Sequence, residues 1–183
     1  MKIRHILLLL LKQLNNKIDS KTKLQKLLYF LSLKLSRNFG YSPYFYGPYS
    51  STVESALDEL ISAGFVEAKR EVFGVDTKKG FEVKRYSFEL TKDGRDFVSI
   101  LNAEDSIEMG KIKDLVDKLN SLGSQDYLSL SIAAKSYYIL SHFQEPMSIN
   151  DIKSKAKEFN WEIDKDDINK AISILEKLDF IKN

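Results

Sequence analysis

Apolar residues in the first forty positions recur at the spacing of α-helices. Residues 3–15 predict a first helix; the run Ile6–Leu11 is shorter than the roughly 20 apolar residues of a membrane span and precedes no small-residue cleavage site, so we expect it to be buried. A second helix is predicted to about Asn38, with Asp19 or Thr22 as its N-cap. Its apolar positions are Leu24, Leu27, Leu28, Leu31 and Leu35. Tyr29 and Phe30 widen this stripe, which indicates packing on more than one side.

A connector rich in glycine, proline and tyrosine, residues 38–50, separates the second helix from a third. The third helix, residues 51–63, has apolar residues at the spacing of one helical face: Val53, Ala56, Leu57, Leu60 and Ile61. Ser51 and Glu54 have the spacing of a capping box at its start, and Gly64 supplies a left-handed stop at its end.

Two strand-like segments follow, Phe65–Phe73 and Phe81–Leu90, with a hairpin tip at residues 76–80. The second segment does not alternate cleanly, and a bulge near Lys84 or Arg85 would reconcile its two phases. Thr91 is expected to cap a short helix that ends near residue 101. Three helices followed by a two-stranded hairpin predict a winged helix-turn-helix, in which the hairpin is the wing and the third helix occupies the DNA-reading position.

The polar residues 102–106 indicate a boundary, so we expect a winged-helix domain at 1–103 and a helical domain at 104–183. The second region predicts a helix ending at Gly123, a helix at about 126–141 that is apolar on most sides, and two capped helices that resemble a second, partial helix-turn-helix. Ser148 with Asp151, and then Asp164, are the predicted caps. Phe180-Ile181 is a candidate strand start. Residues 106–141 are a candidate surface for a homodimer. The overall expectation is a mainly α fold with a small β-hairpin wing.

Charge is uneven along the 183 residues although the net charge is only +2. Residues 1–40 contain nine lysines and arginines and one acid, Asp19, whereas the region after residue 103 is acidic. Such asymmetry is found in proteins with a face for nucleic acid, but it is also typical of ordinary solvated helices. Cysteine is absent, which excludes disulfides and thiolate chemistry and makes a cytoplasmic location the expectation.

Candidate catalytic groups are sparse. The two histidines, His5 and His142, have no second histidine three or four residues away, and the phosphate-binding and serine-nucleophile motifs do not occur. Asp164, Asp166 and Asp167 lie where acids accumulate at a helix start. We therefore expect a protein that is not an enzyme and that uses no metal or cofactor.

Four segments resemble the YwgA-like family of bacterial and archaeal proteins: Lys23–Phe30, Phe45–Ser50, Leu57–Phe65 and Leu90–Arg95. The resemblance covers about residues 22–100 and implies a winged-helix fold more directly than an activity. The first two segments are also similar to the Panacea antitoxin domain of phage- and toxin-linked proteins, which implies binding to a protein. Residues 104–183 carry no resemblance of this kind.

One hypothesis for function is a DNA-binding transcriptional regulator that contacts phosphates through its wing and basic helices. The candidate residues are Lys21, Lys23, Lys26, Lys69, Arg70, Lys78, Lys79, Lys84 and Arg85. The third helix argues against it, because that helix has no basic residue and a reading helix needs donors on its exposed face.

The alternative is a protein-interaction module, antitoxin-like, that uses the acidic third helix and the tyrosine-rich connector. Tyrosine is amphipathic and stiff, which suits it to interfaces, although the same aromatic residues also serve to pack a connector onto a core. The candidate residues are Tyr44, Tyr46, Tyr49, Glu54, Asp58 and Glu59.

Overall fold

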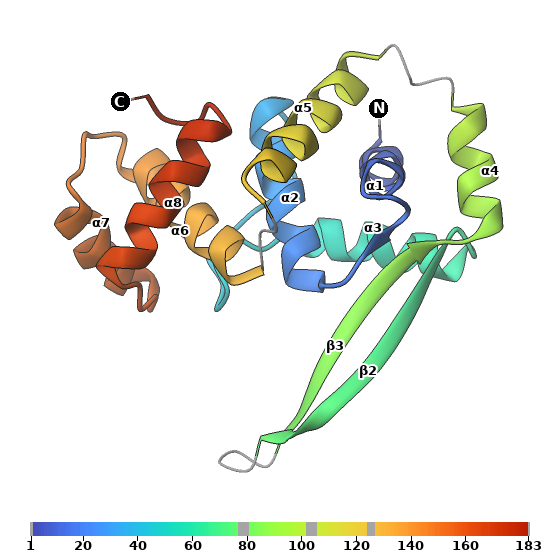
Figure 1. Cartoon of the computed structure of the whole chain (residues 1–183), viewed down its shortest axis with the longest axis horizontal. Helices are drawn as coiled ribbons and strands as arrows, with labels where there is room; N and C mark the ends of the chain where they lie inside the picture. Colours follow the sequence, from blue (N-terminus) through green and yellow to red (C-terminus); the bar gives the residue numbers. More distant parts are fainter. Residues whose placement is uncertain (1, 77–80, 102–105, 124–126, 183) are drawn as a thin grey trace.

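The computed structural model describes residues 2–76, 81–101, 106–123 and 127–182. It is mainly helical, with a small three-stranded antiparallel sheet, as expected, and is compatible with a winged helix followed by a helical region (Figure 1). The elements are α1 (Ile3–Gln13), β1 (Lys17–Ile18), α2 (Lys21–Lys34), α3 (Ser51–Ser62), β2 (Val66–Asp76), β3 (Phe81–Leu90), α4 (Lys92–Ile100), α5 (Ile107–Ser121), α6 (Tyr127–Phe143), α7 (Ile149–Ala156), a 3-10 turn (Lys157–Phe159) and α8 (Lys165–Lys177). No helix among these described residues is long and apolar enough to cross a bilayer.

Helix α2 lies at the centre of the core. Its residues from Leu24 to Ser32 are all buried, because α5, α6 and the strands pack around it. Ser20, not Asp19 or Thr22, is its N-cap, and its side chain accepts a hydrogen bond from the Lys23 amide. The apolar run of α1 is buried, as predicted. One hydrophobic core includes residues from both sides of the boundary expected near 102–106, so that boundary does not divide the core.

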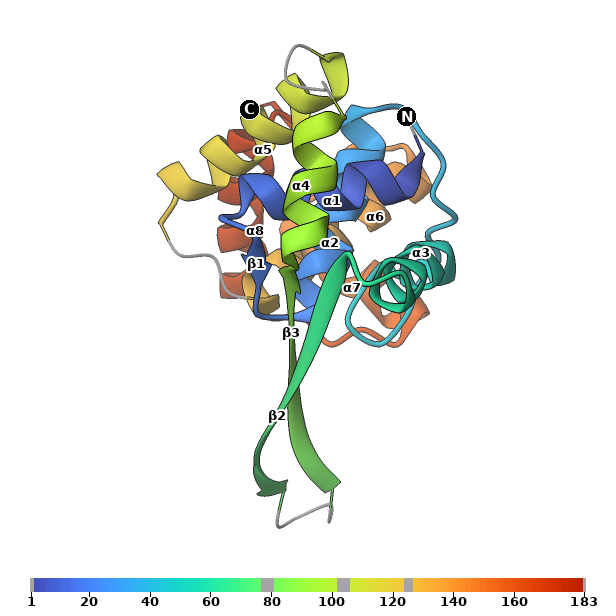
Figure 2. The same cartoon turned by 90° about the vertical axis from the view of Figure 1, so that its right-hand side faces the viewer.

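Strands β2 and β3 form a long antiparallel ribbon that projects away from the helices in both views (Figures 1 and 2). The sequence did not reveal β1, which pairs with the base of β3 through Lys17 and Ile18 to give the order β1-β3-β2. The expected bulge lies in the other strand: the register shifts between Val72 and Gly74 of β2, where Val72 faces Lys84.

The root of the ribbon is fastened to α4 by the Leu90–Arg95 segment. The Thr91 hydroxyl accepts a hydrogen bond from the Gly94 amide at 3.0 Å, as a predicted N-cap should, and also donates to the Gly64 carbonyl at 2.6 Å. The Arg95 guanidinium donates to the Leu90 carbonyl at 2.6 Å. Gly94 lies so close to the Phe65 carbonyl that an added Cβ would be 2.1 Å from its oxygen. The motif therefore holds the ribbon at a fixed place on the body.

Of the helices after residue 106, α5 and α6 pack directly against α2. The apolar character of α6 is explained by burial within the chain, since α2, α7 and α8 all contact it. Ser148 and Asp151 form the predicted capping box of α7, whereas Asp164 stands at the N-cap of α8 without a side-chain cap hydrogen bond. The expected strand at Phe180 does not form; the Phe180 ring packs instead against Phe30, with ring centroids 5.2 Å apart.

Candidate functional site

The connector between α2 and α3 is held against α2 by hydrogen bonds from two neighbouring side chains. Gln25 donates to the Ser50 carbonyl at 3.0 Å and accepts from the Ser50 amide at 3.1 Å. Lys26 donates to the Pro48 carbonyl at 2.6 Å. Two of the four segments that carry the family resemblance, Lys23–Phe30 and Phe45–Ser50, are thus hydrogen-bonded to each other.

Ser50 begins α3, and its hydroxyl accepts from the Val53 amide at 3.1 Å. The capping box expected from Ser51 and Glu54 is therefore wrong by one residue at the cap. The Glu54 carboxylate is instead paired with Lys21 on α2. The Glu54 carboxylate therefore joins two helices rather than capping its own helix.

The middle of the connector is held by residues of the C-terminal region. The Trp161 indole donates to the Tyr44 carbonyl at 2.7 Å. Gly47 has φ +92° and lies against α6, where an added Cβ would be 2.9 Å from Lys135 Cγ and 3.3 Å from the Ser131 carbonyl oxygen. Only glycine combines this backbone conformation with so close an approach.

Three consecutive aromatic side chains, which we call the aromatic rim, project from the connector. Tyr44, Phe45 and Tyr46 are 54%, 78% and 59% exposed. The Tyr44 ring packs against Phe45 edge to face, with centroids 5.0 Å apart, and against Tyr49 at 5.1 Å. The rim is therefore presented to solvent by a backbone that is anchored on both sides.

A pocket of about 390 Å³, the tyrosine pocket, opens between the rim and the start of α2. It brings together Tyr44, Tyr46, Tyr49 and Glu54, four of the six residues predicted for protein interaction. The other lining residues are Lys21, Thr22, Gln25, Lys26 and Gly47. The pocket thus combines aromatic walls with charged and hydrogen-bonding groups from α2.

Lys26 is the most unusual residue of the tyrosine pocket. It is only 2% exposed, and burial, followed by repulsion from Lys135, lowers the pKa of its ammonium to about 7. Lys135 on α6 lies with its ammonium 5.6 Å from the centre of the Trp161 ring, and burial also lowers its pKa. Among the described residues, the Pro48 carbonyl is the hydrogen-bond partner of the Lys26 ammonium, and no carboxylate pairs with it.

The exposed face of α3 is acidic and hydroxylic. Glu54 is paired with Lys21, and Glu59 is paired with Arg4 on α1. Asp58 is exposed and has no ion pair or hydrogen bond among the described residues. Asp58 and Glu59 therefore lie on the outer surface of the helix rather than in the tyrosine pocket.

Comparison with known proteins gives one result that bears on the family of the chain. No family model matches the chain, but a relative does. The uncharacterized protein YwgA of Bacillus subtilis (strain 168) is 30% identical over 166 residues, which is 90% of this chain and 89% of YwgA.

The chain belongs to the YwgA family. The match confirms the resemblance found in the sequence and extends it, because 166 aligned residues necessarily include part of the region after residue 103. The similarity to YwgA therefore includes part of the helical region after residue 103 as well as the connector. The similarity to the Panacea domain stays a prediction.

In this member of the YwgA family, several candidates for phosphate contact are already engaged. Lys26 is buried and bonded to Pro48, so it is not on the surface that a DNA duplex could contact. Lys21 is paired with Glu54. Lys69 lies 3.4 Å from Glu67 and 3.6 Å from Glu89, and these carboxylates raise the pKa of its ammonium.

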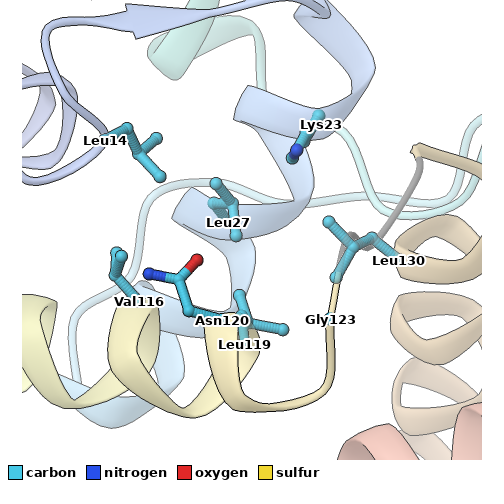
Figure 3. A pocket seen from close by; sticks show the side chains of 8 residues that line it. All are labelled: Leu14, Lys23, Leu27, Val116, Leu119, Asn120, Gly123 and Leu130. Carbon is cyan, nitrogen blue, oxygen red and sulfur yellow. The ribbon is translucent and has the colours of Figure 1, made fainter.

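The remaining basic candidates lie on the ribbon and at the start of α2. Arg70 is exposed on β2. Lys78 and Lys79 lie outside the described residues, as do the side chains of Lys84 and Arg85. Lys23 borders a second hollow of about 370 Å³, where leucine and valine side chains from α1, α2, α5 and α6 converge and Asn120 lies on the α5 side (Figure 3).

The histidines of this YwgA-family chain lie apart, each beside aromatic rings. His5 lies 6.0 Å from the Phe97 ring, and burial, with Lys2 and Arg4 nearby, lowers its pKa. His142 stacks on Tyr138 with ring centroids 6.1 Å apart. Within the described part of the chain, no three histidine, aspartate or glutamate side chains cluster as metal ligands would.

Three residues of the site were missed from the sequence alone. Gln25 and Lys135 gave no signal, since a glutamine or lysine on a helix is ordinarily solvated. Lys26 was interpreted as a surface cation. The signal that could have found it is the pair Tyr29 and Phe30, which indicated that α2 is covered on more than one side.

Proposed function

We propose that this chain is a non-enzymatic regulatory protein that acts by binding another protein through its aromatic rim. The observation that carries the proposal is the exposure of Tyr44, Phe45 and Tyr46 side by side on an anchored loop. Exposed aromatic groups of this kind mark interaction sites, because a protein without a partner gains nothing from leaving them in water. A rim that is already ordered also loses little conformational entropy on binding.

The partner surface that fits this rim carries basic side chains. The faces of tyrosine and phenylalanine rings attract ammonium and guanidinium groups, and the neighbouring helix α3 adds the exposed carboxylate of Asp58. The similarity of the α2 and connector segments to the Panacea domain supports a toxin as one such partner. Burial of the rim would supply the central anchors of the interface.

The test compares three forms of the full chain in affinity purification from native lysate with quantitative mass spectrometry. Triple replacement of the rim (Tyr44→Ser, Phe45→Ser and Tyr46→Ser) should abolish recovery of a stoichiometric partner, and the purified partner should then bind the wild type by calorimetry. Ile100→Ser is the matched control, because Ile100 is a large apolar residue that is 74% exposed on α4, outside the connector. Equal recovery by the rim variant and the wild type would exclude the rim as the interface.

A second candidate function is DNA binding through the ribbon, which the projection of β2 and β3 from the body favours (Figure 2). The acidic face of α3 excludes the usual reading helix from this mode, so the ribbon would contact phosphates or the minor groove. Fluorescence anisotropy with duplex DNA at about 50 and 200 mM salt tests it, because phosphate contacts make affinity fall steeply with salt. Weak binding that is insensitive to salt would refute it.

Self-association through residues 106–141 is a further proposal. Its support is limited to the exposed side chains Ile107, Tyr127 and Leu128, since α6 buries most of its apolar surface within the chain. A monomeric mass by light scattering at working concentration would refute it.

A further inference from the structure

We propose that the tyrosine pocket binds a small organic anion, whose carboxylate or phosphate is held by Lys26 and whose planar body lies against the pocket's tyrosine rings. This site shares Tyr44 and Tyr46 with the protein interface proposed above, but it would bind an anion rather than a basic protein surface. The pocket volume of about 390 Å³ lies within the range of roughly 300–1,000 Å³ that is usual for small-molecule sites.

The first argument is that Lys26 has no counter-ion in the part of the chain that the structure describes. A buried ammonium group is costly unless it is paired, and the cost appears here as a pKa lowered to about 7. The ammonium has three N–H donors, whereas the Pro48 carbonyl is a single neutral acceptor. The charged group behind it, Lys135, has the same sign. An anion in the pocket would supply the missing charge and the missing acceptors.

The second argument is that the pocket offers further unused donors. Within the described residues, the hydroxyl of Thr22 and the phenols of Tyr44, Tyr46 and Tyr49 make no hydrogen bond, although all four residues line the pocket. Hydroxyl groups donate readily to carboxylate and phosphate oxygens. The carboxylate of the pocket, Glu54, is neutralised by its ion pair with Lys21. The lining therefore favours an anion over a cation.

The tyrosine rings define the rest of the ligand. Tyr44 and Tyr49 lie with centroids 5.1 Å apart at an interplanar angle of 34°, and Tyr46 also lines the pocket. Flat aromatic walls contact a planar ring better than a branched aliphatic body. Gln25 holds the connector in place, since its amide nitrogen donates to the Ser50 carbonyl and its amide oxygen accepts from the Ser50 amide.

The test is isothermal titration calorimetry of the full chain with two matched pairs of probes. Adenosine 5′-monophosphate is compared with adenosine, and phenylacetate with phenylacetamide; the two pairs distinguish a phosphate from a carboxylate. At least one anion should bind saturably, and its neutral counterpart about tenfold more weakly or worse, because a charge-assisted hydrogen bond is lost. The proposal would be overturned if neither anion binds saturably at concentrations up to about 5 mM, which is a weak affinity even for a small ligand. Equal affinity of an anion and its neutral analogue would also overturn it.

Proton linkage gives a second, independent readout on the unaltered protein. At about pH 7.5, roughly three quarters of the Lys26 side chains are neutral, so a bound anion should draw protons from the buffer. Titration in buffers of different ionisation enthalpy measures this uptake. The other ionisable groups around Lys26 are Lys21 on α2, Glu54 on α3, Lys135 on α6 and the tyrosines of the connector. Binding without proton uptake would exclude Lys26 as the anion's partner.

Two substitutions complete the test and separate it from the protein interface. Lys26→Met should abolish both anion binding and proton uptake, and Tyr46→Ser, at an exposed residue that tolerates replacement, should weaken binding if Lys26→Met does not fold. Phe45→Ser is the matched control, because Phe45 is exposed beside Tyr46 but does not line the pocket. It should reduce binding of the protein partner and leave the anion affinity unchanged. Unchanged anion affinity in Tyr46→Ser or in a folded Lys26→Met would refute the site.

Discussion

Replacement of Gly94 by alanine should destabilise the protein, although the same change usually strengthens a helix. Gly94 lies in α4, where alanine is favoured over glycine by about 1 kcal/mol. The new Cβ, however, would lie 2.1 Å from the Phe65 carbonyl oxygen and 3.1 Å from its carbon. These are backbone atoms that cannot rotate away, and the oxygen also accepts the Thr91 amide at 3.1 Å. Overpacking of this kind costs roughly 1–3 kcal/mol and occasionally more.

Because a Cβ contact of 2.1 Å with backbone lies far below ordinary packing distances, we place the overpacking cost at the upper end of this range, about 3 kcal/mol. After the helical gain of about 1 kcal/mol is subtracted, Gly94→Ala should lower the free energy of unfolding by about 2 kcal/mol, measured by urea titration with circular dichroism. Gly110→Ala is the matched control, since Gly110 is an exposed glycine of α5 where an added Cβ would meet no neighbouring atom within 4 Å. It should raise stability by about 0.5–1 kcal/mol. A Gly94→Ala variant within about 0.5 kcal/mol of the wild type would show that α4 does not require this close approach.

Three further predictions concern the connector and the core. Because the folded pKa of Lys26 is about 7 and an unfolded lysine keeps its ordinary value, the unfolded chain binds more protons above pH 7. Stability should therefore rise by on the order of 2 kcal/mol between about pH 7 and pH 9 in urea titrations, and Lys26→Met should flatten this rise. Ser136→Ala should raise the melting temperature or leave it unchanged, because this buried hydroxyl has no hydrogen-bond partner among the described residues; a clear loss would indicate a partner. Trp161→Phe should cost more than about 1 kcal/mol in unfolding titrations, because it removes both the bond to the Tyr44 carbonyl and part of a buried side chain; no loss would mean that neither stabilises the fold.

Much of the fold could be predicted because its signals are local. The stripe of α3, the capping box of Ser148 and the cap at Thr91 each depend on residues a few positions apart. The two-residue strand β1 could not be found, because a strand so short has no alternation to detect. Phe180 was predicted to begin a strand because it is apolar and follows a helix. Its ring instead packs against Phe30, which is far away in the sequence and which no local pattern could indicate.

The candidate site was predicted only in its residue types. Tyrosines in the connector and acids in α3 were identified, but the pocket depends on how the connector folds back onto α2 and α6. That placement is set by Gln25, Lys26 and Trp161, whose hydrogen bonds span between 22 and 117 residues of sequence. No periodicity reports contacts over such distances. Tyr29 and Phe30 indicated that α2 is covered on more than one side, but the bond of Lys26 to Pro48 and its lowered pKa came only from the three-dimensional structure.

The central position of α2 has a consequence for how the chain can be divided. Its leucines are covered on one side by elements before residue 101 and on the other by α5 and α6. A truncated protein ending near residue 101 would uncover Leu27, which lies beside Val116, Leu119 and Leu130, and should aggregate when expressed alone. Residues 1–101 are thus not expected to fold as a transferable module, and the intact chain is expected to melt in a single cooperative transition.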